Sequence, residues 1–266
     1  MTPPAAAEFL DFALATARAA GAAILPHFRA PLAVDDKSGG RSYDPVTIAD
    51  RAAETVIRAA IAESYPEHGV RGEEHGRRKG ASCYTWVVDP IDGTRSFILG
   101  QMHWATLIAL HDGQRIVVGV AHQPYVGESF CAADGVAEWR RGIDRRRLAT
   151  RRCASVEDAV VACTDPKMFD PAQRAAFDRV AGRARLTRWG GDCYAYCLLA
   201  MGLIDVVIEA SLEAYDVQAL IPIVEAAGGV MSGWTGAPCD EGGTVLACGD
   251  RTLQPGILAL LSGASG

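Results

Sequence analysis

The sequence predicts an α+β protein of layered helices and sheets, with 266 residues in one domain. Two lobes, about residues 1–145 and 146–266, are expected to share one cleft. Three observations predict this class: amphipathic segments begin the chain, short apolar segments separated by turns follow, and the second half alternates strand-like with helix-like segments. Helices and strands with these patterns must bury their apolar faces against another layer.

Two helices are expected in the first 65 residues. Apolar and small residues recur every four positions from Phe12 to Phe28, which is the spacing of one helical face. The polar stretch 32–45 contains Gly39-Gly40 and is expected to be a loop. A second helix should then reach about Glu63, with Thr47 or Asp50 as its N-cap.

An antiparallel meander is expected next. Residues 70–76 read as a turn at a strand end, and the apolar run 86–88 reads as a buried strand. Three further strands are expected over 104–110, 115–123 and 128–132, and Asp112-Gly113 joins the first two of these as a hairpin. The second half should alternate, with strands at 159–163, 186–189, 204–209 and 245–248 and helices at 171–182, 192–201, 215–227 and 253–261.

Charge and cysteine usage limit the partners and the compartment. The formal net charge is −6, which argues against a nucleic-acid partner. Seven arginines crowd residues 140–152, and we interpret this stretch as a solvated connection rather than a binding patch. No apolar stretch approaches the ~20 residues of a membrane span. Eight scattered cysteines without a C-x-x-C pair, and a start unlike a signal peptide, fit a cytoplasmic protein.

The segment Trp86 to Thr94 reads Trp-Val-Val-Asp-Pro-Ile-Asp-Gly-Thr. Asp89 and Asp92 follow the buried strand, and Gly93-Thr94 should open a helix. Carboxylates suit hard cations such as Mg²⁺, and the free N–H groups of a helix start attract anions. An ordinary turn explains the same residues, because Pro and Asp-Gly both favour turns.

Further acids lie at the ends of other expected elements. Glu73-Glu74 follow a glycine in the upstream turn, and Asp50 and Asp216 stand where loops enter helices. Each has an alternative explanation: the two aspartates could be N-caps, and the glutamates could belong to a solvated turn.

Taken together, these acids form a recognisable pattern. Gly72-Glu73-Glu74, Asp89-Pro90-Ile91-Asp92-Gly93-Thr94 and Tyr215-Asp216 followed by Glu225-Ala226-Ala227-Gly228-Gly229 resemble the motifs of the inositol monophosphatase family. The resemblance extends from about Lys37 to Gly229. It implies a layered α/β/α/β/α sandwich, a Mg²⁺-dependent phosphomonoesterase activity with two to three ions per site, and a homodimer.

The resemblance also implies roles for individual residues. Glu73, Asp89 and the carbonyl of Ile91 would hold one metal ion, and Asp89, Asp92 and Asp216 would hold a second. Thr94, with Glu73, would orient the attacking water, and the N–H groups of Gly93 and Thr94 would hold the phosphate. Asp50 matches a carboxylate near the metals, and Lys37 matches a lysine in a loop beside the site. Two cations ~4 Å apart would neutralise the dianionic ester and lower the pKa of water.

The identity of the ester is addressed by two shorter motifs. Arg95-Ser96-Phe97 resembles the histidinol-phosphatase branch of that family, and Arg188-Trp189-Gly190-Gly191-Asp192 places a carboxylate at the expected substrate wall. Histidinol carries an ammonium group and an imidazole, which Asp192 and Glu209 could bind by charge-assisted hydrogen bonds. Arg188 is expected to be a further substrate-contacting residue. Asp192 could also be a helix N-cap.

L-histidinol phosphate is therefore the expected substrate. The alternatives are inositol-1-phosphate or a broad range of sugar phosphates, and, from another class, a catalytically silent regulatory protein.

Overall fold

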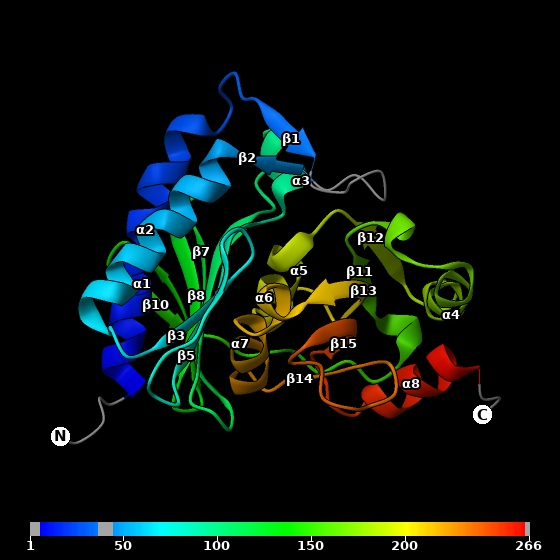
Figure 1. Cartoon of the computed structure of the whole chain (residues 1–266). Helices are drawn as coiled ribbons and strands as arrows, with labels where there is room; N and C mark the ends of the chain where they lie inside the picture. The colour runs from blue at the N-terminus through cyan, green and yellow to red at the C-terminus, as the bar shows by residue number, and fades with distance from the viewer. Residues whose placement is uncertain (1–5, 37–44, 264–266) are drawn as a thin grey trace.

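The structure is a computed structural model that describes residues 6–36 and 45–263. Helices and sheets alternate in five layers, which confirms the predicted α/β/α/β/α sandwich (Figure 1). An eight-stranded sheet is formed by residues up to Arg147, and a five-stranded sheet by residues from Val160 onward. One helical layer separates the two sheets, and further helices cover their outer faces.

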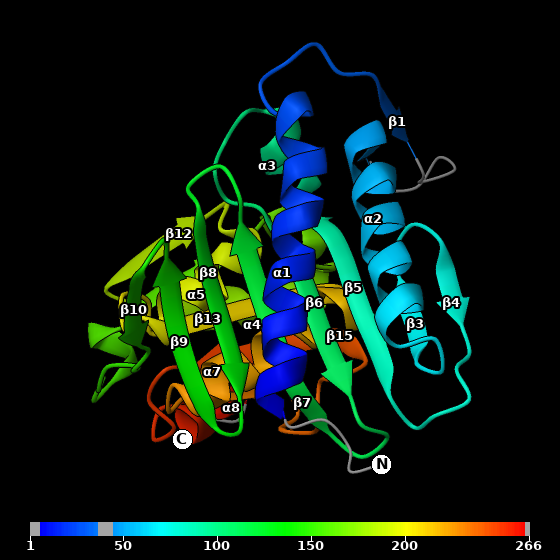
Figure 2. The ribbon, with the colours of Figure 1, turned by 90° about the vertical axis from the view of Figure 1, so that its left-hand side faces the viewer.

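The first helical layer consists of α1 (Ala6–Ile24) and α2 (Ile48–Ser64), which lie side by side on one face of the larger sheet (Figure 2). A short 3-10 turn, Leu25–His27, follows α1. Thr47 is the N-cap of α2, and its side chain forms a capping box with Asp50. The buried face of both helices packs on Trp86, Val88 and other residues of the sheet.

By length and composition, one helical segment among the described residues, Ala6–His27, could cross a membrane. The expectation that no apolar stretch is this long was therefore wrong, because only three charged residues interrupt this alanine-rich segment. Half of its most apolar window is buried against the rest of the protein. Its apolar residues Phe9, Ala13 and Ala17 are part of the core between helix and sheet, which is the role of a core helix.

The larger sheet is mostly antiparallel, and only β3 and β5 run parallel. In sheet order its strands are β10 (Asp144–Arg147), β9 (Val136–Arg141), β8 (Glu128–Ala133), β7 (Ile116–Gln123), β6 (Ala105–His111), β5 (Thr85–Asp92), β3 (Gly69–Gly72) and β4 (Gly76–Arg78). Strand β5 contains the acidic motif, and its pairing with β6 shifts register between Asp89 and Asp92. This bulge adds residues on one strand and redirects its side chains.

The arginine-rich stretch is not an irregular connection. Its first part forms the antiparallel hairpin β9–β10 at the edge of the larger sheet, in which Arg145 pairs with Arg140 and Arg146 pairs with Trp139. The guanidinium of Arg146 lies 5.2 Å from the centre of the Trp139 ring. The expectation missed these strands because their side chains are mostly charged, whereas strand prediction relies on apolar alternation.

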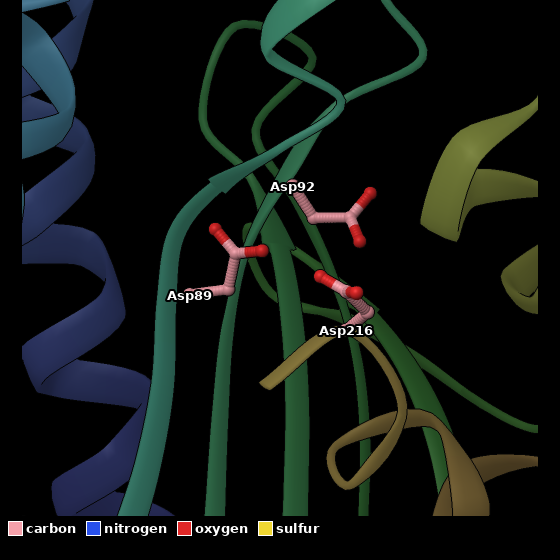
Figure 3. Close-up of side chains that lie close together, drawn as sticks. All are labelled: Asp89, Asp92 and Asp216. Carbon is pink, nitrogen blue, oxygen red and sulfur yellow. The ribbon is translucent and has the colours of Figure 1, made fainter. Parts of the chain in front are cut away.

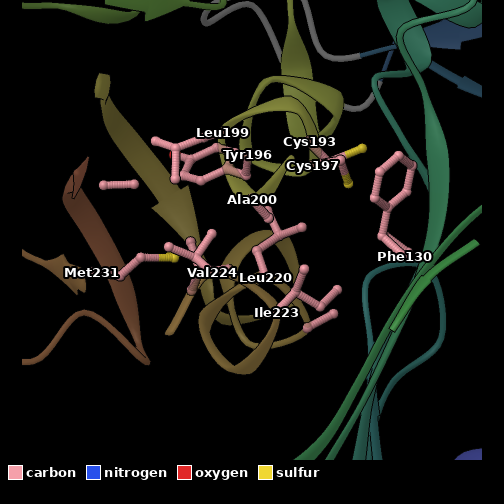
Figure 4. Close-up of a cluster of buried hydrophobic side chains, with 14 of the residues drawn as sticks. Phe130, Cys193, Tyr196, Cys197, Leu199, Ala200, Leu220, Ile223, Val224 and Met231 are labelled. Atoms are coloured by element: carbon pink, nitrogen blue, oxygen red, sulfur yellow. The ribbon is translucent and has the colours of Figure 1, made fainter. Parts of the chain in front are cut away.

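The middle layer contains α5 (Asp192–Ala200), α6 (Ala214–Val217) and α7 (Leu220–Ala226). Figure 4 shows how Leu220 and Ile223 of α7 and Cys197 of α5 pack together, with Phe130 of the larger sheet on one side and Met231 on the other. The predicted helix 215–227 is thus two short helices, with a break at residues 218–219. The break separates α6, which carries Asp216, from α7.

The smaller sheet has the order β12 (Leu186–Trp189), β11 (Val160–Cys163), β13 (Val206–Glu213), β15 (Gly242–Cys248) and β14 (Val230–Ser232). Helices α4 (Pro171–Ala181) and α8 (Gln254–Ser262) cover its outer face, where Phe177 and Ile257 meet residues such as Val206. Two short 3-10 turns, Val156–Asp158 and Pro166–Met168, flank β11.

Several short strands were also missed. The stretch predicted as a loop contains β1 (Val34–Asp36), which pairs with β2 (Pro45–Thr47) in front of α2, while residues 37–44 lie outside the described part of the chain. Strand β14 adds to the smaller sheet beside β15. Three-residue strands are too short for a periodic pattern, so only their partners define them.

His122 of β7 gives a testable pH dependence of stability. It is 6% exposed, and burial lowers the pKa of its imidazole from 6.5 to about 4. Between those values the unfolded chain binds a proton that the folded chain does not, so stability is fully present above pH 6.5 and falls as the pH drops toward 4. At ~1.4 kcal/mol per pKa unit, the loss attributable to His122 is about 3 kcal/mol.

The measurement is urea unfolding between pH 7.5 and pH 4.5 of the natural chain and of His122→Gln. The variant should lose less stability over this range, because glutamine does not titrate. Other groups titrate in both proteins, so the difference between the two curves isolates His122. Parallel curves would contradict the assignment.

Candidate active site

A cavity of about 850 Å³ is lined by residues from both halves of the chain. From the first half come Glu73 and the segment Asp92–Arg95, and from the second half come residues at the ends of strands and the starts of helices. The titratable and hydroxyl-bearing lining residues of the second half are Thr164, Asp165, Lys167, Asp192, Cys193, Tyr196, Glu209, Ser211, Glu213, Tyr215 and Asp216. The predicted acids that lie far apart in sequence therefore meet at one place.

Three carboxylates converge at this cavity, which two of them, Asp92 and Asp216, line. One oxygen each of Asp89, Asp92 and Asp216 lies within 4.8 Å of the others (Figure 3). Asp89 and Asp92 come from either side of the bulge in β5, and Asp216 comes from α6. The backbone supports all three: Ile91 N–H donates to Asp89 at 3.0 Å, Cys193 N–H to Asp92 at 3.0 Å, and Glu213 N–H to Asp216 at 2.7 Å.

The electrostatics of this cluster favour a cation. Burial raises the pKa of Asp89 and Asp92 well above the ordinary value, and the neighbouring carboxylates raise both further. For Asp216, burial first and Glu73 and Glu209 next raise the pKa to about 7. A divalent cation among these oxygens would reverse the repulsion, and oxygen-only ligands suit hard ions such as Mg²⁺. The residues present therefore fit a magnesium site.

Glu73 and Ile91 lie beside the three aspartates. Glu73 stands in the turn between β3 and β4, lines the cavity, and is close enough to raise the pKa of Asp89. The Ile91 side chain is buried, and its carbonyl accepts a hydrogen bond from the Thr94 hydroxyl at 3.0 Å. The structure thus brings together all five residues that the sequence assigned to metal binding.

Asp50 is both a capping residue and a neighbour of the site. Its Oδ2 accepts hydrogen bonds from the N–H and hydroxyl of Thr47 at 2.8 and 2.6 Å, so Asp50 is the N3 partner in the capping box and Thr47 is the N-cap. Its Oδ1 accepts a hydrogen bond from the Thr94 hydroxyl at 3.4 Å. Asp50 therefore couples the start of α2 to Thr94.

Gly93 allows the acidic segment to turn into α3 (Thr94–Ile98). Its φ of 88° is in the left-handed region, and a Cβ atom there would lie 2.5 Å from the His103 carbonyl oxygen. Only glycine meets both demands without strain. As predicted, a helix follows the motif, although it has only five residues.

Asp192 does not cap its helix. The N-cap of α5 is Gly191, without a side-chain cap, and Asp192 itself has a φ of 44°. Its Oδ2 instead accepts a hydrogen bond from the Ser96 hydroxyl of α3 at 2.7 Å. The carboxylate lines the cavity, and burial raises its pKa. The two motifs that suggested the substrate, around Ser96 and around Asp192, are therefore in direct contact.

Glu209 lies deeper in the same wall and already has several partners. It accepts hydrogen bonds from the N–H and hydroxyl of Thr164 and, at 3.0 Å, from the Tyr196 hydroxyl. Burial raises the pKa of Glu209 to about 7. Thr164 also accepts a hydrogen bond from Asp192 N–H at 3.0 Å, so it links the two acids.

Sequence reasoning missed Thr164, Tyr196, Arg95 and Lys167 as lining residues. Thr164-Asp165 directly follow the buried strand β11, so the rule that polar residues at strand ends build sites would have indicated them. The Arg95 guanidinium lies 3.7 Å from Asp165 across the cavity. The positively charged side chains of Arg95 and Lys167 thus line a pocket whose other charged residues are acidic.

Two predicted residues are not placed in the cavity. Arg188 is exposed on the edge strand β12 and is not among the residues that line the cavity. The expectation that Arg188 contacts the substrate is therefore not supported by its position. Lys37 lies outside the described residues.

Comparison with known proteins gives concordant matches. A model of the inositol monophosphatase family matches residues 5–265. Bifunctional phosphatase IMPL2, chloroplastic, of Arabidopsis thaliana is 39% identical over 84% of the chain, which spans only 63% of that relative. A histidinol-phosphatase of Chlorobaculum parvum is 33% identical over 95% of the chain and 96% of its own length.

Two further matches show the range of such proteins. Nus factor SuhB of Escherichia coli is 34% identical over 85% of each chain. The solved structure of an inositol monophosphatase from Zymomonas mobilis is 36% identical and superimposes with a TM-score of 0.85, over 97% of this chain and 99% of that one.

Proposed function

Because the chain belongs to the inositol monophosphatase family and is a phosphatase, we propose that it hydrolyses L-histidinol phosphate to L-histidinol and phosphate, with Mg²⁺ as cofactor. The observation that carries the choice of substrate is the acidic cavity wall. Asp192, held by Ser96, faces a pocket in which Asp165 and Glu209 are also present. An ammonium or imidazolium group binds such a wall better than a neutral polyol does.

Five groups would hold the metal: the carboxylates of Glu73, Asp89, Asp92 and Asp216, and the Ile91 carbonyl. Two to three Mg²⁺ ions would neutralise the phosphate and activate water when bound. The chain's own residues would do the remaining work by positioning. Thr94, between Asp50 and the Ile91 carbonyl, would orient the attacking water together with Glu73, and the N–H groups of Gly93 and Thr94 would hold phosphate oxygens.

The cationic part of the substrate would lie against the opposite wall. Asp192 is the first candidate partner, because Ser96 already orients its carboxylate toward the cavity. Glu209 accepts three hydrogen bonds from Thr164 and Tyr196, so it would contribute chiefly its negative charge. Arg188 has no part in this arrangement.

The second candidate substrate is inositol-1-phosphate. It is favoured by the 36% identity to the inositol monophosphatase of Zymomonas mobilis over nearly the whole chain. A homodimer, the absence of a nucleic-acid partner and a cytoplasmic location stay predictions from the sequence.

The test is phosphate release from L-histidinol phosphate, inositol-1-phosphate and glycerol phosphate, each with Mg²⁺ and with EDTA. We expect the highest kcat/KM for L-histidinol phosphate and no release in EDTA. Equal or faster turnover of inositol-1-phosphate would contradict the assignment of L-histidinol phosphate as the substrate. Phosphate release in EDTA would contradict the requirement for Mg²⁺.

A further inference from the structure

The turn that carries Glu73 is fastened to α2 by a buried carboxylate. Glu54 is 0% exposed, and its Oε2 accepts a hydrogen bond from Glu74 N–H at 2.7 Å. Its Oε1 accepts another from His75 N–H at 3.1 Å. These two N–H groups belong to the residues directly after Glu73, so one carboxylate fixes the backbone on which the Glu73 side chain stands.

Arg58 completes this attachment from the next turn of α2. Its Nε donates to Glu54 Oε1 at 2.6 Å, and its terminal nitrogen donates to the Gly76 carbonyl at the end of the same turn. The guanidinium thus balances the buried charge of Glu54 and holds the far side of the turn. A buried carboxylate with several charge-assisted hydrogen bonds keeps a fixed position.

Gly72 allows this close approach. A Cβ atom at Gly72 would lie 2.1 Å from Glu54 Oε1, which is far below any van der Waals contact. The carboxylate has no free space to move into, since it is buried and hydrogen-bonded on both oxygens. Only a glycine at position 72 therefore leaves room for the Glu54 carboxylate against the turn.

The same helix also supports the other side of the site. Asp50 lies four residues before Glu54, so both project from one face of α2. Asp50 reaches toward Thr94, and Glu54 reaches the turn of Glu73. One helix thereby sets the positions of two elements that meet at the cluster of Asp89 and Asp216.

We propose that Glu54 is a positioning residue that sets the affinity of the site for divalent cations by fixing the turn of Glu73. It would act through the backbone N–H groups of Glu74 and His75 and would touch neither metal nor substrate. The proposal rests on the proposed role of Glu73 as a metal ligand. Partners that orient metal ligands typically change affinity or activity by 10–100-fold when they are lost.

The first variant is Glu54→Gln, which keeps the size of the side chain. Its amide has one acceptor oxygen and one NH₂ group, so one of the two N–H groups of the turn must lose its acceptor. In the metal-free protein, the amides of Glu74 and His75 should exchange faster with solvent, as measured by NMR. The Kd for Mg²⁺, measured by calorimetry, should rise by roughly 10–100-fold.

Two further variants sharpen the comparison. Gly72→Ala leaves Glu54 chemically intact but displaces its carboxylate, so it should shift both readouts in the same direction. Glu63→Gln is the matched control: it makes the same chemical change at an exposed position of α2 and should alter neither.

Activity separates positioning from loss of folding. In Glu54→Gln the Mg²⁺ concentration for half-maximal phosphate release should rise, while kcat at saturating Mg²⁺ returns close to the natural value. A purely structural role would instead lower kcat at every Mg²⁺ concentration.

The outcomes distinguish this proposal from the proposed function. An unchanged Mg²⁺ affinity in Glu54→Gln, with tight binding by the natural chain, would overturn the role of Glu54 alone. Failure of the natural chain to bind Mg²⁺ would overturn the metal assignment and this proposal together. Weaker Mg²⁺ binding in Glu54→Gln and Gly72→Ala, together with unchanged Mg²⁺ binding in Glu63→Gln, would support the positioning role of Glu54.

Discussion

Asp89→Asn is expected to lower Mg²⁺-dependent phosphate release by about two to four orders of magnitude while leaving the protein folded. Asp89 is the predicted ligand of both metal ions, and metal ions contribute several kcal/mol to a transition state of this kind, at about 1.4 kcal/mol per factor of ten in rate. Asparagine is isosteric and keeps an oxygen to accept the hydrogen bond from Ile91 N–H.

The stability of the metal-free variant gives a second, opposite signal. Burial and four neighbouring acids raise the pKa of Asp89, so the carboxylates of the cluster repel one another without a cation. Removing one charge relieves this repulsion, and thermal unfolding in EDTA should occur at the same or a higher temperature than for the natural chain. Added Mg²⁺ should stabilise the natural chain more than the variant.

The matched control is Asp144→Asn, which removes the same charge from the exposed edge strand β10. It should change neither activity nor the response to Mg²⁺. Activity of Asp89→Asn near that of the natural chain would mean that the metal ligands are assigned wrongly.

Part of the acidic cluster could be predicted because Asp89 and Asp92 stand in one specific linear motif. Asp89 and Asp92 are three positions apart, a spacing that would place them on opposite faces of a regularly alternating strand. The register shift in β5 between them brings both carboxylates into one site. The motif indicated the pairing of these carboxylates, but the bulge depends on the neighbouring strand β6. No local pattern in the sequence specifies it.

The burial of Glu54 could not be predicted from local sequence patterns. It lies four residues before Arg58 on an amphipathic helix, a spacing that normally indicates an exposed ion pair. Its burial results from the approach of a turn 20 residues away, which Gly72 permits. Thr164 is a similar case, since it joins Asp192 to Glu209 only after three strands and a helix have assembled.

Strands rich in charged residues could not be predicted from the sequence either. The hairpin β9–β10 is rich in arginine; β8 pairs with β9 along its whole length, and β9 in turn pairs with β10. Arg188 was given a role from its place in a motif, yet the edge strand that contains it directs the side chain to solvent. Motif position alone does not reveal which face of a strand reaches a site.

Asp192→Ala is expected to reduce kcat/KM for L-histidinol phosphate by roughly 10–150-fold, while glycerol phosphate is hydrolysed almost as before. A hydrogen bond to a charged group contributes about 1.5–3 kcal/mol, and only the cationic substrate can form it with Asp192. The neutral ester is the internal control, because any general damage to the metal site would slow both substrates equally.

Asp192→Asn separates charge from shape. It retains an oxygen that can accept the Ser96 hydrogen bond, so the contact between α3 and α5 is kept while the negative charge is lost. If the charge selects the substrate, Asn should lose nearly as much activity toward L-histidinol phosphate as Ala does. If Asn behaves like the natural chain and Ala slows both esters alike, Asp192 serves to join the two helices, and substrate selection must come from Asp165, Glu209 or the cavity's shape.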